Sequence, residues 1–517
     1  MSSPRSLFFN LKHIHARRKC PCPGTLQRRS FASSTRLYLR TTELDDSKLS
    51  GLQVNPSRLW DTIHSTAQWT SKTFSSDIMR AGLSRLTLTD EDKQARDWFV
   101  ATTESLGCKT HVDQMGNIFA VRPGLNNDVA ATFAGSHLDS QPSGGRFDGV
   151  LGVAAGIEML RVLNENWIET EAPVGVVNWT NEEGARFPVS MMGSSVWAGR
   201  MPIDKAWASR SVSVGATDAT VKEELDRIGY LGDVPCRAGA EGTPLGAHFE
   251  LHIEQGPKLE KARHKVGIVE GVQAYKWFTV TITGRESHAG TTDFDSRGDA
   301  LFFAATFIQK VRKIAESLKG LATIGIMQVS PGSVNTVPGQ VTMSLDLRNP
   351  IDRGLRRMVT KVEEFVELVN TGTVPIREQH DGPKKKKTSN KAITFEEEQK
   401  YRKMHENSLT RIHLDLKEDF SSDATKFNIA AVSCVEKSAE SLVGQDKIQR
   451  ITSGAGHDSV CTNAHCPTGM IFVPCKDGVS HNPSEWCQEE DCAIGANVLL
   501  HSVLRMDRMR KERGELD

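Results

Sequence analysis

The sequence predicts an α/β protein with two domains. The larger has a mixed, mostly parallel sheet flanked by helices, and a ferredoxin-like α+β domain is inserted into it. With 517 residues, the chain is too long for one compact core. Apolar runs at residues 129–134 and 174–177 enclose a segment with helical spacing, which indicates a βαβ unit. From residue 276 the order changes to β-α-β-β-α-β, the ferredoxin-like pattern.

Residues 1–42 have the composition of a mitochondrial targeting segment. They contain nine Lys or Arg and no Asp or Glu, together with many Ser and Thr. We expect a cleavable transit peptide and a mitochondrial location. A basic tail without a targeting role, and therefore a cytoplasmic protein, is the alternative.

Charge and hydropathy exclude two classes of partner. The chain has 64 basic and 64 acidic residues, so removal of the nine basic residues would leave a net charge of about −9. This charge argues against a nucleic acid. No apolar run approaches the roughly 20 residues that a membrane span needs. We therefore expect neither a nucleic acid nor a membrane as a partner.

Residues 55–270 are expected to form the first part of the larger domain. The stretch 55–107 is predicted helical, with Pro56 at a helix start and amphipathic spacing through 58–69 and 90–106. The βαβ unit follows, with its helix over 149–163. Residues 188–246 predict a helix and surface loops, and FELHIEQGP from Phe249 predicts a strand that ends at glycine and proline.

Residues 271–417 are expected to form the inserted domain, and residues 418–517 to complete the larger one. Predicted strands cover 277–284, 321–329, 340–348 and 412–416, and predicted helices cover 299–318 and 352–369. Near 378–400 lie KKKKTSN and EEEQK with almost no apolar residues, which predicts a disordered charged insertion. A basic patch that binds a partner is the alternative.

Five polar side chains follow the strands of the βαβ unit: His137, Asp139, Asp148, Glu182 and Glu183. In open sheets of this kind, ligands bind beyond the carboxyl ends of the strands. His137, Asp148 and Glu183 are donors that Zn²⁺, Co²⁺ or Mn²⁺ accepts. Asp139 suits orientation of the His137 ring, and Glu182 suits a general base. Each alone is more often a solvated or structural residue, but together they predict a metal site.

Two further histidines complete the predicted ligand set. His252 lies in the strand FELHIEQGP, and His481 lies in the turn after the apolar run MIFVP. Gln255, three residues past His252, is placed to face a substrate. The predicted ligands are therefore three histidines and two carboxylates.

Four other residues are candidates for binding a substrate. SHAGTT contains His288, NTVPG contains Asn335, DLRNP contains Arg348, and the glycine-rich TSGAGHDSV contains His457. Arginine suits bidentate binding of a carboxylate, whereas an amide and an imidazole suit polarising a carbonyl oxygen. Arg348 and Asn335, taken singly, are more often structural.

Nine motifs, in chain order, resemble those of one family: GSHLDS, GGRFDGVLGV, NEEGARF, ELHIEQGP, SHAGTT, NTVPG, DLRN, GAGHDS and GVSHNPSE. It is the amidase/hydantoinase/carbamoylase family of dinuclear metal amidohydrolases, within the aminoacylase–carboxypeptidase metallopeptidase superfamily. The family includes β-ureidopropionase, N-carbamoyl-L-amino-acid hydrolase and allantoate amidohydrolase. The matching segments lie between about residues 55 and 510, apart from the charged insertion. The resemblance implies a homodimer whose small domain both dimerises and closes over the site.

The resemblance also implies a role for each candidate residue. Asp148 would bridge two divalent metal ions, Zn²⁺ being expected first and Mn²⁺, Co²⁺ or Ni²⁺ being alternatives. His137 and His252 would complete one metal site, and Glu183 and His481 the other. Glu182 would be the base. The implied substrate contacts, some of them from the partner subunit, are Gln255, His288, Asn335, Arg348 and His457.

The implied reaction is cleavage of the ureido C–N bond of N-carbamoyl-β-alanine or an N-carbamoyl-L-amino acid to the amino acid, ammonia and carbon dioxide. Allantoate or ureidoglycolate is an alternative substrate. An aminoacylase or dipeptidase is more distant, because those relatives usually carry an acid in place of His252. A non-catalytic binding module would predict loss of Glu182 or of a ligand, and all are present.

Overall fold

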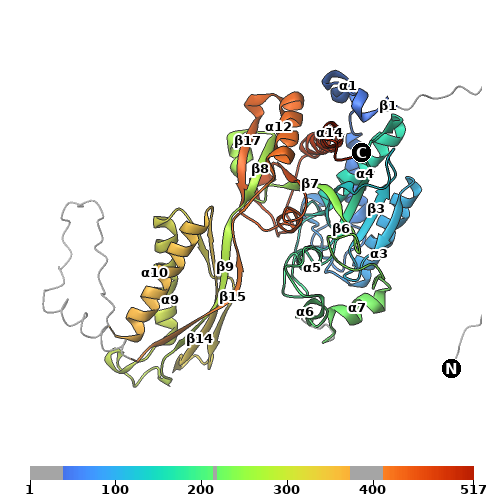
Figure 1. Ribbon diagram of the computed structural model, residues 1–517. Coiled ribbons are helices and arrows are strands. Elements are labelled where there is room, and N and C mark those ends of the chain that lie inside the picture. The colour runs from blue at the N-terminus through green and yellow to red at the C-terminus, as the bar shows by residue number, and fades with distance from the viewer. Residues whose placement is uncertain (1–38, 213–217, 373–410, 517) are drawn as a thin grey trace, which may run out of the picture. The chain divides into compact units, whose positions relative to one another are not determined.

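The computed structural model describes residues 39–212, 218–372 and 411–516, and two hydrophobic cores organise them (Figure 1). One core belongs to a large domain, residues 39–272 and 423–516. The other belongs to a small domain, residues 273–372 and 411–422. The predicted α/β fold is confirmed. The predicted insertion at 378–400 lies outside the described residues, as do residues 1–38 of the predicted targeting segment.

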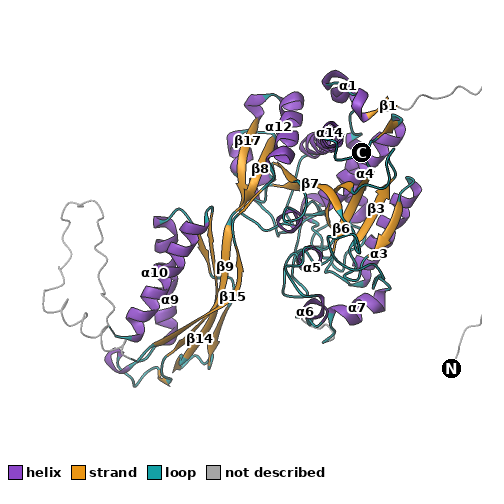
Figure 2. Ribbon diagram, viewed as in Figure 1, coloured by secondary structure: helices purple, strands orange, loops and turns teal. Residues whose placement is uncertain are grey.

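A mixed sheet forms the centre of the large domain (Figure 2). Its described strands run in the order β16-β8-β18-β7-β4-β6-β3-β2, and β17 also pairs with β8. The four central strands β18, β7, β4 and β6 are parallel, so their carboxyl ends share one edge. The strands are β2 (Lys109–Val112), β3 (Ile118–Arg122), β4 (Ala131–His137), β6 (Val174–Trp179), β7 (Leu245–Ile253), β8 (Val266–Val272), β16 (Thr425–Lys426), β17 (Ile448–Ser453) and β18 (Thr468–Val473).

Helices flank this sheet, and α4 is the most buried of the long ones. It has buried side chains around almost its whole circumference, because it contacts β4, β6 and β7 as well as α2 and α14. The helices of the large domain are α1 (Asp46–Gly51), α2 (Pro56–Thr66), α3 (Asp90–Ser105), α4 (Val150–Glu165), α5 (Met192–Trp197), α6 (Ile203–Trp207), α7 (Val221–Ile228), α8 (Lys258–Ala262), α12 (Ile429–Val443), α13 (Asp458–Thr462) and α14 (Glu489–Glu512).

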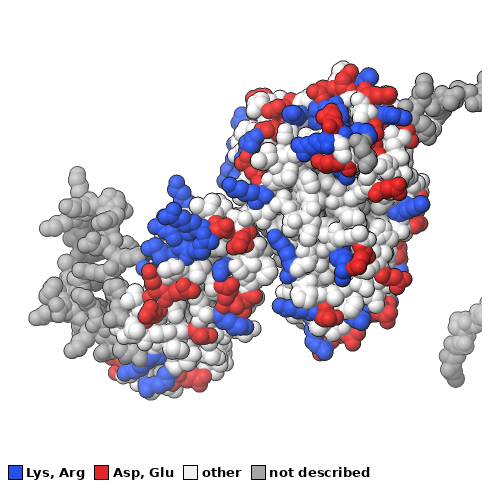
Figure 3. All heavy atoms as spheres, viewed as in Figure 1, with Lys and Arg blue, Asp and Glu red and all other residues white. Residues whose placement is uncertain are grey.

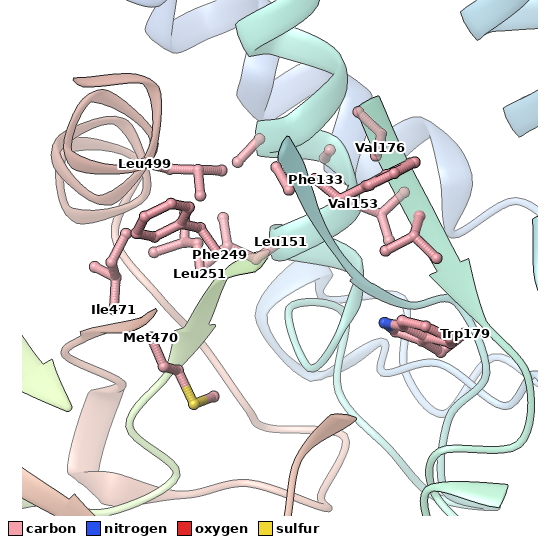
Figure 4. Close-up of a cluster of buried hydrophobic side chains, with 14 of the residues drawn as sticks. Phe133, Leu151, Val153, Val176, Trp179, Phe249, Leu251, Met470, Ile471 and Leu499 are labelled. Atoms are coloured by element: carbon pink, nitrogen blue, oxygen red, sulfur yellow. The ribbon is translucent and has the colours of Figure 1, made fainter. Parts of the chain in front are cut away.

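Large apolar side chains fill the space between the sheet and these helices (Figure 4). Phe133 of β4, Phe249 of β7 and Ile471 of β18 come from parallel strands, and Leu151 of α4 and Leu499 of α14 come from the helices. All five are at most 1% exposed, so the strand ends that carry the polar candidates are held by a closely packed core.

The small domain has the predicted ferredoxin-like topology. Its sheet has the order β11-β14-β9-β15, with β12 also on β14, and every pairing is antiparallel. Helices α9 and α10 pack on one face of this sheet (Figure 1). Residues such as Phe278 and Leu345 form the core on that face. The elements are β9 (Ala274–Thr283), β10 (Ser287–His288), α9 (Ala300–Ser317), β11 (Leu321–Thr323), β12 (Met327–Ser330), β13 (Thr336–Val337), β14 (Gln340–Asn349), α10 (Asp352–Asn370) and β15 (His413–Ser422).

Two N-terminal regions differ from the sequence expectation. The stretch 55–107 is not continuously helical, since the segment between α2 and α3 is held by tertiary pairing, such as the Leu83 amide donating to the Gly144 carbonyl at 2.9 Å. In addition, residues 39–42 belong to the folded large domain. There β1 (Leu39–Arg40) pairs with β5 (Ile168–Glu169), and the Thr41 hydroxyl donates to Asp507.

Charged side chains of both signs are scattered over the visible surface without forming one large field (Figure 3). Figure 3 shows Lys and Arg interspersed with Asp and Glu on the large domain, and a group of basic side chains on the small domain. On that domain, Arg353, Arg356 and Arg357 of α10 are exposed. Among the described helices, none is both long enough and apolar enough to cross a membrane.

Candidate metal centre

The five predicted metal ligands meet at the carboxyl edge of the large sheet. His137 is the last residue of β4, and His252 lies near the end of β7. Asp148 immediately precedes Gly149, the N-cap of α4, while Glu183 follows β6 and His481 follows β18. The parallel strands therefore bring together side chains from distant parts of the sequence.

Asp148 stands at the centre of this group. Its Oδ1 lies 3.0 Å from His252 Nε2 and 3.6 Å from His137 Nε2. Its Oδ2 lies 3.3 Å from His481 Nε2, which is in turn 3.4 Å from Glu183 Oε2. Within each of the two groups, the donor atoms are all within 4.8 Å of one another. One carboxylate thus faces two separate sets of nitrogen and oxygen donors.

The histidine tautomers fit cation binding. His137 Nδ1 lies 2.9 Å from the Asp139 carbonyl oxygen, and His252 Nδ1 lies 2.9 Å from the Ile253 carbonyl oxygen. A carbonyl only accepts, so each Nδ1 carries the proton and each Nε2 presents a lone pair. His137 Nε2 is buried and has no hydrogen-bond partner among the described residues. An orphaned lone pair directed at two carboxylates is what a divalent cation would satisfy.

The hydrogen bonds of Asp139 differ from those that the sequence predicted. Its carboxylate was expected to hold the His137 ring, but its backbone carbonyl is the closer group, and Oδ1 is 3.7 Å from Nδ1. The carboxylate instead accepts from the backbone amides of Glu182 at 3.4 Å and Glu183 at 3.3 Å. The side chain therefore positions the turn that carries both glutamates.

The electrostatics of the site reflect buried acids and imidazoles placed close together. Burial and the neighbouring Asp148 raise the pKa of Glu183 to about 7. Burial also raises the pKa of Glu182 well above its ordinary value, although His137 opposes the shift. For Asp148, burial alone would raise the pKa, but the neighbouring imidazoles of His137, His252 and His481 hold it well below the usual range. Protons and cations therefore compete for the same donors.

Glu182 lies where its carboxylate can contact a molecule bound beside the predicted metal ligands. Its Oε2 lies 3.6 Å from His137 Nε2, and it lines the same cavity as Asp148 and Glu183. It belongs to neither donor group around Asp148. The two adjacent glutamates therefore differ in position: Glu183 belongs to a donor group, and Glu182 lies beside it.

Three residues that support the ligands carried no predicted role. Glu485 Oε1 accepts from the backbone amides of Phe147 and Asp148, both at 3.0 Å. The Ser480 hydroxyl contacts Glu485 Oε2 at 2.8 Å and Asp148 Oδ2 at 3.1 Å. The Gln141 side-chain amide donates to Glu183 Oε2 at 2.8 Å. All three lie within five residues of a predicted ligand or of Asp139, which is the one sequence signal that could have indicated them.

A cavity of about 1250 Å³ opens beside the cluster, and three of the predicted substrate contacts line it. Gln255 lines it, but its side-chain amide also donates to Asp148 Oδ2 at 2.8 Å. His457 is buried, and its ring centroid lies 4.6 Å from that of His252. Burial is the main cause that lowers the pKa of His457 to about 3, and the nearby His252 lowers it further. Arg348, from β14, reaches the cavity from the small domain.

His288 and Asn335 lie elsewhere in this chain. They sit side by side on the small domain, where β10 pairs with β13 and the Ala289 amide donates to the Asn335 carbonyl at 2.9 Å. Both side chains are exposed, and neither lines the cavity at the metal centre. A single chain therefore does not bring these two predicted contacts to the site.

The fold and the donor set define a two-domain α/β protein with a candidate two-cation site at the carboxyl edge of its large sheet. The sequence model of Peptidase family M20/M25/M40 matches residues 133–505, and the chain belongs to this family.

Comparisons with individual proteins point to one branch of that family. An N-carbamoyl-L-amino-acid amidohydrolase of Rhizobium meliloti is 36% identical over 458 residues, covering 87% of this chain and 96% of that protein. The crystal structure of an amidase of the hydantoinase/carbamoylase family from Burkholderia multivorans is 38% identical, with a TM-score of 0.72, covering 89% of this chain and 99% of that one. A ureidoglycolate hydrolase of Oryza sativa subsp. japonica is 29% identical over 436 residues, covering 83% of this chain and 82% of that protein.

Proposed function

We propose that this protein is a metal-dependent amidohydrolase that cleaves the ureido C–N bond of N-carbamoyl amino acids. One water is consumed, and the products are the amino acid, ammonia and carbon dioxide. The observation that carries the proposal is the meeting of His137, His252, Glu183 and His481 around Asp148, with Glu182 beside them. The hydantoinase/carbamoylase relatives support the ureido substrate.

The side chains present fit two divalent cations, which Asp148 would share. His137 and His252 would hold one, and Glu183 and His481 the other. Bound cations would polarise the ureido carbonyl and make a water molecule more acidic. Zn²⁺ is the first candidate, and Mn²⁺, Co²⁺ and Ni²⁺ accept the same donors.

The residues of the chain then supply proton transfer and orientation. Glu182 takes a proton from the attacking water and passes it to the amino-acid nitrogen as the C–N bond breaks. Arg348 binds the substrate carboxylate, and this contact holds the ureido carbonyl carbon beside Glu182. The other product, carbamic acid, decomposes to ammonia and carbon dioxide.

We also propose that the active form is a homodimer in which the partner subunit brings His288 and Asn335 to the site. Both side chains are exposed on the small domain, and neither lines the cavity of its own chain. Apolar side chains are exposed on the same domain, including Phe302 of α9 at 57% and Ile326 at 63%. An imidazole and an amide are suited to stabilising the developing oxyanion.

A mitochondrial location remains a proposal that rests on the composition of residues 1–42. Fluorescent fusions of the full chain and of residues 39–517 would test it. The full chain is expected in mitochondria and the shorter one in the cytoplasm, and identical distributions would contradict the proposal.

A substrate panel tests the reaction. The purified protein is loaded with each of the four metals and assayed for ammonia release from N-carbamoyl-L-amino acids, N-carbamoyl-β-alanine, ureidoglycolate and allantoate. Acetyl-amino acids and dipeptides serve as controls that lack the ureido group. Hydrolysis of the N-carbamoyl compounds, abolished by chelation, is expected. Preferred hydrolysis of ureidoglycolate would favour the function named for the rice relative.

Glu182→Gln separates the base from the ligands. We expect it to lower kcat by about 10²-fold to 10⁴-fold, because the water loses its proton acceptor. Its metal content should equal that of the parent, since Glu182 lies outside both donor groups. Parent-like turnover by this variant would contradict the proposed role.

A further inference from the structure

The face of the small-domain sheet opposite α9 and α10 carries aromatic residues beside Arg348. Leu345 and Leu347 of β14 pack into the core under the helices, so Asp346 and Arg348 point to the other face. On the neighbouring strand β9, Tyr275 lies opposite Arg348, and Trp277 lies opposite Asp346. Arg348, which is proposed to bind the substrate carboxylate, therefore lies on the same surface as these aromatic residues.

The rings form a connected group. The Trp277 ring centroid lies 5.7 Å from that of Tyr275 and 5.3 Å from that of Phe420 on β15, and Tyr275 and Phe420 are 5.5 Å apart. The Arg348 guanidinium lies over the Tyr275 ring, 5.2 Å from its centroid. Tyr275 is buried and Trp277 half-buried, so neighbours hold the group in place while part of its surface stays accessible.

This aromatic surface faces the cavity of the metal centre. Tyr275 and Trp277 line that cavity together with Arg348, Glu182 and Leu321, and Leu321 is 61% exposed. Apolar surface beside a few convergent polar groups is typical of a subsite that binds an apolar part of a small molecule.

The chemistry of the substrate identifies that part. In an N-carbamoyl α-amino acid, the carbon that bears the carboxylate also bears the side chain. Once Arg348 binds the carboxylate, the side chain is held close to the neighbours of Arg348. In N-carbamoyl-β-alanine the same carbon is an unsubstituted CH₂, which would leave the aromatic surface unoccupied.

We infer that Trp277 and Tyr275 form the subsite for the substrate side chain, and that the preferred substrates are N-carbamoyl α-amino acids with aromatic or large apolar side chains. This inference rests on the proposed function and narrows its substrate class. Trp277 is its specificity-determining residue, because it is the more accessible of the two rings.

The test compares N-carbamoyl-L-phenylalanine with N-carbamoylglycine and N-carbamoyl-β-alanine. In the parent, kcat/KM for the phenylalanine derivative should exceed that for the other two by about tenfold or more. Trp277→Ala should lower kcat/KM for the phenylalanine derivative about tenfold and leave that for the glycine derivative within about twofold. Trp277→Leu keeps an apolar side chain, so its kcat/KM for the phenylalanine derivative should lie between the values for the parent and for Trp277→Ala.

Trp98→Ala is the matched control, because Trp98 packs on the large-domain core and does not line the cavity. It should not change the ratio between the substrates. Equal kcat/KM for the phenylalanine and glycine derivatives in the parent would overturn the inference, as would an equal loss for both in the Trp277 variants. Those outcomes leave the proposed function standing, whereas failure to hydrolyse any ureido compound would overturn both.

Discussion

At the scale of single residues, Asp346 fixes the direction in which Arg348 can bind. Both carboxylate oxygens of Asp346 accept from Arg348 Nε at 3.0 Å, and Asp346 Oδ2 also accepts from Arg348 Nη2 at 2.7 Å. Arg348 Nη1 donates to the Gly454 carbonyl at 2.7 Å. A guanidinium has five N–H donors, so one hydrogen remains on each of Nη1 and Nη2. Those two hydrogens can bind a substrate carboxylate end-on.

We therefore expect Asp346→Ala to raise KM for N-carbamoyl amino acids about tenfold while kcat stays within about threefold, because the guanidinium loses its orientation. Steady-state kinetics on an N-carbamoyl amino acid and on its carboxamide would measure this. Only the compound with a free carboxylate should be affected. A similar rise in KM for both compounds would indicate a general structural role for Asp346.

A second residue, Gly149, allows the close approach of α4 to a ligand. Its φ is +68°, and a Cβ there would lie 2.4 Å from His137 Cε1. Gly149→Ala should displace the His137 ring, reduce the bound metal measured by atomic absorption, and lower the free energy of unfolding by about 1–3 kcal/mol.

The matched control is Gly229→Ala, because Gly229 has a φ of +75° and nothing within 4 Å of the added Cβ. It should show the cost of backbone strain alone and keep full metal content. Equal metal loss in both variants would show that backbone strain, rather than the contact with His137, accounts for the effect.

At the scale of elements, the loop between β18 and α14 carries His481 and is anchored by Glu485. The Glu485 carboxylate is 2% exposed and accepts from two backbone amides of the turn before α4. Glu485→Ala leaves those buried amides unpaired, so we expect about 10-fold to 100-fold weaker metal binding in competition with a chelator. Glu490→Gln, at an exposed position of α14, is the control and should bind metal normally.

The sequence predicted elements better than loops, and the site shows why. Strands β4, β6 and β7 and helix α4 follow from apolar runs, which report burial directly. The roles of Asp139 and Gln255 depend instead on loop geometry set by contacts with distant segments. Gln255 and His481 both have positive φ, at 55° and 53°, which no local pattern in their segments predicts.

At the scale of the whole molecule, the position of His288 and Asn335 decides how many chains make one site. Residue types and motifs identified both as candidates, but a pattern within one sequence does not say which subunit a side chain serves. In the structure their side chains are exposed and line no part of the cavity of their own chain. If a partner subunit donates them, as proposed, a two-fold dimer would let each subunit complete the site of the other.

A heterodimer separates the two arrangements. Glu182→Gln and His288→Ala chains, each nearly inactive alone, are coexpressed with different tags, and the mixed dimer is isolated on both. If His288 acts in trans, the site on the His288→Ala chain has its own Glu182 and receives His288 from its partner. That dimer has one complete site of two, so its specific activity should be about half that of the parent. If His288 acts within its own chain, neither site is complete, and the mixed dimer should be as inactive as either homodimer.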